Sequence, residues 1–182
     1  MARGLGVTYR RAHAGDLERL YAIDDEASAL FASAGVDMSA LTDEHPFVRA
    51  ERARIKRALD AGLVELALDP DSAAIGFIAS GFVDDKPYIE ELAVVPSWMR
   101  RGVGGALLRN ACANAASAGA LWLTTYAHLP WNGPMYARAG FLAVPEHECG
   151  PGIREILREQ REALPQPEQR IAMVRSFGRE VI

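Results

Sequence analysis

Two arginines and three glycines stand close together in the segment Arg100–Gly105, which reads RRGVGG. A helical pattern begins inside it, because Val103, Leu107 and Ala111 fall on one face. A helix start leaves about four backbone N–H groups unpaired and carries roughly half a positive charge. Glycine lets an anion approach such a backbone closely, and arginine adds charged donors. The segment is therefore expected to bind a phosphate or diphosphate, with a plain glycine turn carrying solvated arginines as the alternative.

Two well-known phosphate-binding loops do not fit this segment. A P-loop requires Lys followed by Ser or Thr after its last glycine, whereas Gly105 is followed by Ala106. The dinucleotide pattern GxGxxG requires a glycine where this chain has Leu107. The loop therefore belongs to neither class.

Glu90 and Glu91 are the candidate proton-transfer groups close to this loop. They lie in Tyr88–Val95, which is rich in β-branched and apolar residues and predicts a buried strand. Successive side chains of a strand point to opposite faces, so only one of the two carboxylates can face a given site. The face that holds Glu90 also holds Tyr88, Leu92 and Val94.

Periodicity and turn residues predict the elements that must position these groups. Strands are expected over 7–11, 63–68, 74–83, 88–95, 121–126 and 170–176, with another beginning at Phe141. Helices are expected from Leu17, over 47–59, from 102 to about 118, briefly at Pro134, and over 151–164. Asp16 is predicted to cap the first helix, and most charges of the second are expected on a solvated face. The irregular segment 29–46 is either a substrate lip or a plain connection.

Two motifs resemble one known family. Leu92-Ala93-Val94, Pro96, Arg101-Gly102-Val103-Gly104 and Ala106-Leu107-Leu108 together resemble the acetyl-CoA signature of the GNAT N-acetyltransferases. Downstream, Tyr136-Ala137-Arg138-Ala139-Gly140-Phe141 is similar to the Y-x-x-x-G-F element of that family. The order and the spacing of the two motifs also match, and the resemblance covers about 63–144. One departure is Met99, where the family usually has Gln or Arg, so one side-chain contact to phosphate is missing.

The resemblance implies a fold. We expect a single domain over 1–182, with the acetyl-CoA-binding core at about 63–144 and a helical insertion at 151–164 that minimal relatives lack. The implied class is α/β, with a mixed, mostly antiparallel central sheet flanked by helices. The sheet would be split between strands 4 and 5, which leaves backbone groups free for the amide-bearing arm of the coenzyme.

The resemblance also implies acetyl-CoA as co-substrate and a set of residues that bind it. These residues are Leu92, Ala93, Val94, Arg100, Arg101, Gly102, Val103, Gly104, Gly105, Ala106 and Asn132. Many relatives place an asparagine seven residues before the tyrosine of the second motif, where this chain has Leu129. Asn132 lies only four residues before Tyr136 and is the nearest substitute.

Acyl transfer from a thioester to an amine needs a base and an acid. A lysine-like amine with a pKa near 10.4 is neutral only about once in several thousand molecules at pH 7, and a positioned base recovers part of that deficit. In relatives the base lies near the level and on the face of Tyr88 and Glu90, so Glu90 is the expected base, directly or through water, with Glu91 in reserve. Alternatively, Glu90 orders a water or the substrate ammonium. Tyr136 is the expected acid for the leaving thiolate, against a purely structural role.

Other reactive residue types are interpreted more simply. Cys112 is predicted to fill the core, and two cysteines make no disulfide framework, which favours a reducing compartment. His128 follows a predicted strand and either borders the acceptor site or is solvated. His147, Glu148 and Cys149 are too few and too close in sequence to predict a zinc site, so no metal is expected.

Composition limits the class of protein and the kinds of partner that can be expected. With 182 residues, 49% apolar and 24% charged, the chain is typical of globular proteins. Its net charge of -4 argues against nucleic-acid partners, and no apolar run approaches the length that spans a membrane. The N-terminal MARGLGVTYRR lacks the apolar core of a signal peptide, so a cytoplasmic location is expected.

The expected activity is direct acetyl transfer from acetyl-CoA to a primary amine, in a ternary complex. The expected acceptor is a small amine or amino-acid derivative. One alternative is a peptide or protein acceptor, which requires an open groove near 29–46. Another is a non-catalytic acyl-CoA sensor. Homodimers are frequent among relatives of this family, so the oligomeric state stays open.

Overall fold

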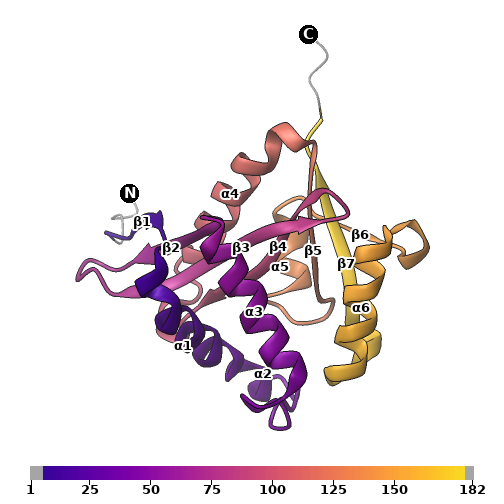
Figure 1. The fold of residues 1–182 in the computed structure, drawn as a ribbon, viewed down its shortest axis with the longest axis horizontal. Helices are drawn as coiled ribbons and strands as arrows, with labels where there is room; N and C mark the ends of the chain where they lie inside the picture. The colour runs from indigo at the N-terminus through magenta and orange to yellow at the C-terminus, as the bar shows by residue number, and fades with distance from the viewer. Residues whose placement is uncertain (1–5, 179–182) are drawn as a thin grey trace.

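Seven strands form one sheet in the computed structural model, which describes residues 6–178 (Figure 1). The spatial order is β1-β2-β3-β4-β5-β7-β6. The strands are β1 (Thr8–Arg11), β2 (Val64–Leu68), β3 (Ala74–Val83), β4 (Lys86–Val94), β5 (Ala120–Tyr126), β6 (Leu142–Val144) and β7 (Arg170–Ser176). Neighbouring strands are antiparallel except β4 and β5, which are parallel. The predicted mixed, mostly antiparallel sheet is confirmed.

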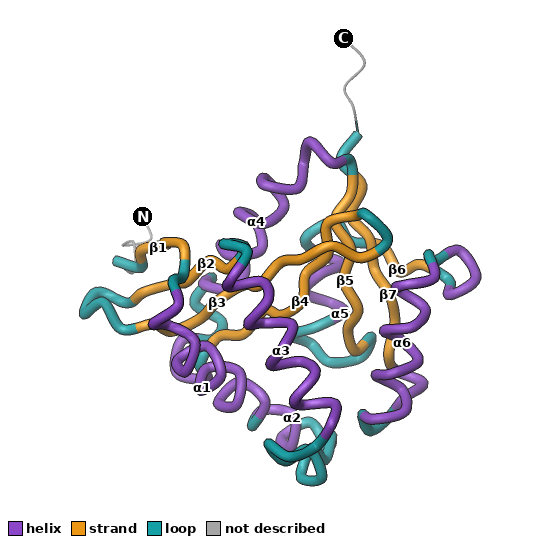
Figure 2. The backbone as a smooth tube through the Cα atoms, viewed as in Figure 1, coloured by secondary structure: helices purple, strands orange, loops and turns teal. Residues whose placement is uncertain are grey.

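Helices cover both faces of this sheet (Figures 1 and 2). They are α1 (Leu17–Ser28), α2 (Leu30–Ser33), α3 (Pro46–Asp60), α4 (Val103–Ala115), α5 (Gly133–Arg138) and α6 (Pro151–Ala163). Helices α1 and α3 lie on one face, and α4 and α5 lie on the other. Helix α6 packs against β7, β5 and α3. It therefore brings the C-terminal part of the chain next to the middle of the sheet.

The predicted elements agree with the structure to within a few residues, but the predicted cap at Asp16 is wrong. Asp16 directly precedes α1, yet its side chain makes no capping hydrogen bond. Its carboxylate instead accepts from the Arg10 guanidinium at 2.8 and 2.9 Å and from the His13 amide at 2.8 Å. A 3₁₀ turn (Ala14–Asp16) precedes α1, and the carboxylate points back toward Arg10 on β1. A charged guanidinium is a stronger hydrogen-bond donor than the neutral amides of the helix.

Strands β4 and β5 separate soon after they meet, as the resemblance implied. Their only register pair within residues 6–178 is Tyr88 with Trp122. The Tyr88 and Thr124 hydroxyls share a hydrogen bond of 2.7 Å close to this point. Beyond it, Leu92, Ala93 and Val94 pair with β3 on one side and with no strand on the other. Backbone groups along this edge therefore need partners from outside the sheet.

The core lies on both sides of the central strands. Apolar side chains from α1, α3, β2, β3, β4 and α4 form the main cluster, which includes Cys112 as predicted. The segment 29–46 is held down on a smaller cluster, where Val36 packs against Tyr126 and Leu129. No helix within residues 6–178 combines the length and the apolar character that crossing a membrane requires. The outer ends of the predicted domain, 1–5 and 179–182, lie outside the described residues, as does the start of the N-terminal stretch analysed above.

Candidate active site

A β-bulge in β4 decides where the two candidate carboxylates point. Ala79 pairs with Glu91 and the next residue, Ser80, pairs with Ile89, so Glu90 is an extra residue without a partner on β3. A bulge interrupts the alternation of a strand and turns two successive side chains toward one side. The prediction that only one carboxylate can face a given site is therefore wrong. The carboxylate of Glu90 lies where a Cβ at position 81 would be, so Gly81 leaves the room for it.

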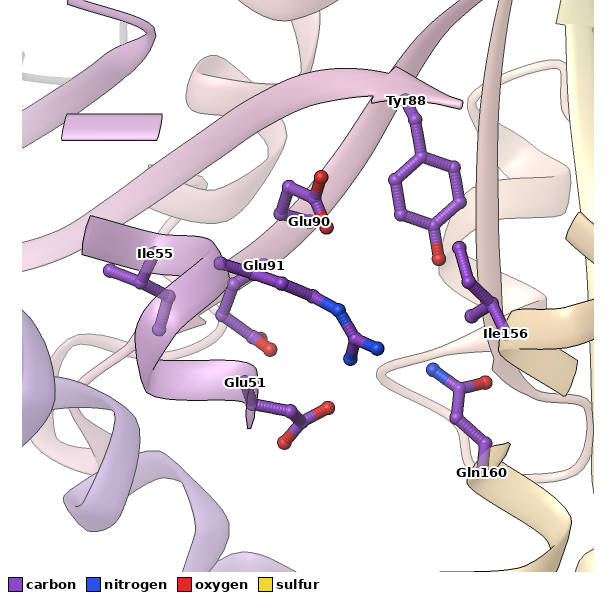
Figure 3. Close-up of a pocket in the computed structure, with 8 residues that line it drawn as sticks. Glu51, Ile55, Tyr88, Glu90, Glu91, Ile156 and Gln160 are labelled. Carbon is purple, nitrogen blue, oxygen red and sulfur yellow. The ribbon is translucent and has the colours of Figure 1, made fainter. Parts of the chain in front are cut away.

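Both carboxylates line one small cavity (Figure 3). Its volume is about 10 Å³, roughly the space that one water molecule needs. Helices α3 and α6 and strand β4 form its walls. The lining residues are Glu51, Arg54, Ile55, Tyr88, Glu90, Glu91, Ile156 and Gln160. The cavity is thus lined by carboxylates, by hydrogen-bond donors and by two isoleucines. Its lining includes Tyr88, the residue at which β4 pairs with β5.

The carboxylates of the cavity have no direct ion-pair partner in the described part of the chain, although the charges of Arg54 and Arg170 act on them. Within residues 6–178, Glu51, Glu90 and Glu91 form no ion pair. Burial raises the pKa of Glu51 to about 7, and the charge of Asp24 on α1 contributes. Burial also raises the pKa of Glu91 to about 7, with a further contribution from Glu51, while a hydrogen bond from the Leu92 amide opposes the rise. Burial raises the pKa of Glu90 as well, although Arg54 lowers it. Such a cavity attracts a cation and holds a base that titrates near neutral pH.

Tyr136 lies on α5 and is electrostatically linked to this cavity. Burial raises the pKa of its hydroxyl far above the usual value, and the charge of Glu91 is the next cause. Its ring packs edge-on against Phe141 at 5.8 Å. The hydroxyl has no hydrogen-bond partner within the described part of the chain, so it is a free donor that stays protonated. The structure therefore brings the predicted acid into the electrostatic neighbourhood of Glu91.

The glycine loop forms an open helix start. The first helical hydrogen bond of α4 joins the Ala106 amide to the Gly102 carbonyl at 2.9 Å, so the amides of Val103, Gly104 and Gly105 precede it without helical acceptors. Gly102 has a φ of 89°, and a Cβ there would meet no atom within 4 Å. Arg100 and Arg101 are exposed, and the Arg101 guanidinium lies 5.0 Å above the Trp98 ring. This corner is not blocked by side chains.

An open groove continues from this corner toward β1. Its walls include Arg101, Gly102, Val103 and Ala106 on one side and Val7 and Tyr9 on the other. Free amides, two guanidinium groups and an accessible groove are the features that a diphosphate needs. The residues present therefore fit the diphosphate of a coenzyme.

Three positions that the family pattern singles out have other contacts. The Asn132 side-chain amide donates to Thr125 Oγ1 at 2.8 Å, which leaves its second N–H and its oxygen for a coenzyme. Leu129 is 1% exposed and packs against Val36 and Tyr126. Met99 is half-buried against the main core, so packing accounts for its departure from the family pattern.

The remaining candidates lie away from the cavity. His128 is exposed and contacts the Tyr126 ring edge-on at 5.8 Å. His147 and Glu148 are exposed, whereas Cys149 is buried. Within residues 6–178, no group of three or more His, Cys, Asp or Glu side chains is arranged to hold a metal ion.

Three polar residues of the cavity were not predicted from the sequence: Glu51, Arg54 and Gln160. The charges of α3 were expected on a solvated face, yet Glu51 and Arg54 face the cavity. A signal for Glu51 was present, because it lies four residues from both Phe47 and Ile55, within the buried stripe of the helix. Gln160 lies on α6, and no local pattern relates that helix to β4.

The model of the acetyltransferase (GNAT) family matches residues 19–141, which is more than half of the chain. The chain belongs to this family. It is therefore an acetyl-CoA-dependent acyltransferase. The match ends before α6, so the helix that supplies Gln160 and Ile156 lies outside the matched region.

Solved structures support the same fold. PaiA N-acetyltransferase from Thermoplasma acidophilum, in complex with coenzyme A, aligns with a TM-score of 0.68 at 16% identity over 93% of this chain and 98% of that one. Ard1 from Thermoplasma volcanium aligns with a TM-score of 0.62 at 16% identity over 96% and 99%. N-acetylglutamate synthase from Neisseria gonorrhoeae, complexed with coenzyme A and N-acetyl-glutamate, aligns with a TM-score of 0.67 at 21% identity. The alignment covers 98% of this chain but only 37% of that synthase. These likenesses concern the fold.

Proposed function

We propose that this GNAT enzyme transfers the acetyl group of acetyl-CoA to the primary amine of a small molecule, directly and in a ternary complex. The observation that carries the proposal is the bulge at Glu90, because it turns two carboxylates into one buried cavity beside the open edge of β4. Tyr136 stands near the same point and is a free donor. These observations support a base, an acid and a coenzyme-binding edge in one region of the sheet.

The bulge reopens the choice between the two glutamates. We assign the role of base to Glu91 and give Glu90 the role of orienting the ammonium or a water, which was the alternative considered for Glu90. Glu91 has a pKa near the pH at which it must work, and a hydrogen bond from the Leu92 amide fixes its position. Its charge also acts on Tyr136, so proton removal from the amine and proton donation to the thiolate are close together.

Direct transfer is favoured because neither cysteine is a good acyl carrier. Both Cys112 and Cys149 are buried, and burial raises the pKa of each thiol. A thiol with a raised pKa is a weak nucleophile at neutral pH. Cys112 lies in the main core, and Cys149 donates to the Pro145 carbonyl at 3.5 Å. The amine itself is therefore the nucleophile that attacks the thioester carbonyl, and the coenzyme thiolate leaves.

A small acceptor is favoured over a peptide or protein. The segment 29–46, which a peptide-binding groove would need to leave open, is anchored by Val36 and by Phe31, whose ring lies 5.8 Å from that of Tyr126. Gln166 also donates to the Gly35 carbonyl at 3.3 Å. The cavity itself is walled by α3, β4 and α6. A closed segment 29–46 and an enclosed cavity both favour a small molecule.

The test is a transfer assay on the full chain. The protein is mixed with acetyl-CoA and a panel of small amines, amino acids and short peptides, and free thiol and acetylated product are both measured. We expect amine-dependent thiol release that matches product formation one to one. Tight coenzyme binding with only slow, amine-independent hydrolysis would instead favour an acyl-CoA sensor, and a preference for peptides would overturn the small-molecule acceptor. A covalent acetyl-enzyme in the absence of amine would overturn direct transfer.

A further inference from the structure

Gln160 presents an unpaired side-chain NH₂ group to the acceptor cavity. The residue is 6% exposed, and its Oε1 accepts from Arg170 Nε at 3.2 Å and from Nη2 at 2.7 Å. A guanidinium group only donates, so the side-chain oxygen of Gln160 must face Arg170 and its NH₂ group must face the opposite way. Figure 3 shows that this nitrogen points into the open space of the cavity. It has no hydrogen-bond partner within residues 6–178 and remains accessible to water, so it is a donor that a bound acceptor can use.

Arg54 presents further donors to the same space. Its Nη2 pairs with Glu159 Oε2 at 2.6 Å, and its side chain is only 18% exposed. A guanidinium group has five N–H donors in a planar fork, and within the described residues only Nη2 has a partner. Because Arg54 lines the cavity beside Gln160, its remaining donors can bind a planar anion together with the amide.

The scaffold holds these donors in place. Asp84, in the turn before β4, accepts from the amides of Gly152 at 2.8 Å and Ile153 at 3.2 Å, and so caps the N-terminus of α6. A side chain at Gly150 or Gly152 would collide with Asp84. The Arg54–Glu159 pair ties the same helix to α3. Gln160 therefore lies on a helix that is held by Asp84 at its N-terminus and by Arg54 at the neighbouring residue, Glu159.

The cavity is therefore lined by groups of opposite chemistry. Glu51, Glu90 and Glu91 supply acceptors, and Arg54 and Gln160 supply donors. A plain monoamine satisfies only the carboxylates. A diamine places its second positive charge against Arg54. An acceptor with an ammonium and a carboxylate close together satisfies both sides.

We propose that the acceptor is an amino acid, and that Arg54 and Gln160 bind its carboxylate while the glutamates bind its amine. Because the cavity has room for only about one water molecule in this structure, its walls must move apart to admit the amino acid. This inference rests on the proposed function and specifies its substrate class. It also gives α6, which lies outside the family match, the task of selecting the acceptor.

The test compares acceptors that differ only in the carboxylate. Alanine, methionine and lysine are each paired with the amine left by decarboxylation and with the carboxamide, and kcat/KM is measured at saturating acetyl-CoA. A buried polar site discriminates strongly against a ligand that leaves its groups unpaired. For the preferred side chain we expect the amino acid to exceed the decarboxylated amine at least 10-fold, with the carboxamide between them. Equal or better use of the decarboxylated amines overturns the inference, and equal use of the carboxamides points to peptide N-termini and also overturns it.

Variants locate the preference. In Arg54→Gln and in Gln160→Leu, the ratio of kcat/KM for the amino acid to that for its decarboxylated amine should fall at least 5-fold. Arg49→Gln, an exposed arginine on the same helix, should leave the ratio unchanged. Because the readout is a ratio of two kcat/KM values, a general loss of activity does not change it. If either variant keeps the parent ratio, the inference is overturned. Turnover without a carboxylate preference overturns this inference alone, whereas no turnover with any acceptor overturns the proposed function as well.

Discussion

The glycine loop, for which we propose coenzyme binding, and the cavity, for which we propose acceptor binding, are built from different parts of the chain. The loop is contiguous in sequence, exposed, and built on the backbone amides at the start of α4, with arginine side chains alongside. The cavity is assembled from side chains of three elements more than a hundred residues apart, from Glu51 to Gln160. It is enclosed, and its carboxylates have no ion-pair partner within residues 6–178. Substitutions of the loop glycines therefore change only backbone shape and ligand approach, whereas substitutions of the cavity glutamates change charge, proton affinity and stability together.

The largest effect is expected from Glu91→Gln. The neutral amide keeps the shape but cannot take a proton, so kcat should fall ~10²–10⁴-fold at pH 7. The KM for acetyl-CoA should change little, since the loop is left intact. In the parent enzyme, activity should rise with pH through about 7, because the raised pKa of Glu91 keeps the base protonated below that value. Initial rates from pH 6 to 9 measure both effects.

Glu90→Gln is the matched control for this comparison. Glu90 neighbours Glu91 at the bulge and lines the same cavity, but it is assigned no proton transfer. We expect a smaller loss that lies mainly in the KM for the amine. If Glu90→Gln gives the larger loss in kcat and Glu91→Gln keeps its activity across the pH range, the base is Glu90, as the sequence analysis expected.

Tyr136→Phe is expected to have the next largest effect. The phenyl ring keeps the edge-on packing against Phe141, so only the hydroxyl is lost. Without this donor the thiolate must leave unprotonated, and kcat should fall ~10–10²-fold. Coenzyme affinity, measured by calorimetry, should change less than 3-fold. Unchanged turnover would reduce Tyr136 to a packing role.

The two regions also differ in how much of them the sequence could predict. The loop was predictable because every part of it, from Arg100 to Ala106, is local, and its chemistry follows from the order of glycines and arginines. The strand Tyr88–Val95 was predicted as well, but not the bulge within it. A bulge depends on the register with β3, where Gly81 leaves room for Glu90, and register is not a local property.

The cavity was only half predictable for the same reason. Glu90 and Glu91 were found from their strand, and Glu51 could have been found from its place in the apolar stripe of α3. Arg54 and Gln160 could not, because their roles arise from the packing of α6 against α3 and β7. The misassigned cap at Asp16 follows the same logic, since a partner in β1 decided its hydrogen bonds.

Glu51→Gln should show how much stability the cavity charge costs. The folded pKa of Glu51 is about 7, well above the value near 4.5 of an unburied carboxyl, so the folded state binds more protons between these pH values. Stability should therefore fall as pH rises from about 4.5 to 7. The variant should be more stable than the parent by on the order of 1–3 kcal/mol at pH 8, and nearly equal at pH 4.5. Urea unfolding at the two pH values measures the difference.

The same substitution should move the activity profile. Removing the charge of Glu51 lowers the pKa of Glu91, so the rise in rate should shift to lower pH. Glu44→Gln, at an exposed site, is the control and should show neither change. A parent protein whose stability does not fall between pH 4.5 and 7 would contradict the raised pKa of Glu51 in the cavity.

The smallest effects on activity and stability should come from the loop. Alanine at Gly102 tests backbone shape, and alanine at Gly104 tests how closely the ligand approaches. Gly102 has a φ of 89°, and its added Cβ would meet nothing, so Gly102→Ala should cost about 1–2 kcal/mol through the backbone alone. Gly104 is inside α4, and a Cβ there would make only an ordinary contact, 3.6 Å from Val94 Cγ2. Gly104→Ala should therefore stabilise the protein by roughly 0.5–1 kcal/mol.

Coenzyme affinity should separate these two variants. A methyl group at position 104 stands beside the free amides and hinders a diphosphate, so Gly104→Ala should weaken coenzyme A binding while it raises the melting temperature. Gly102→Ala should lower both, because a distorted turn displaces the same amides. Calorimetric titration with coenzyme A and thermal unfolding give the two quantities for each protein. A Gly104→Ala variant with unchanged affinity would mean that the diphosphate does not approach these amides, and the contrast between a backbone site and a side-chain site would no longer hold.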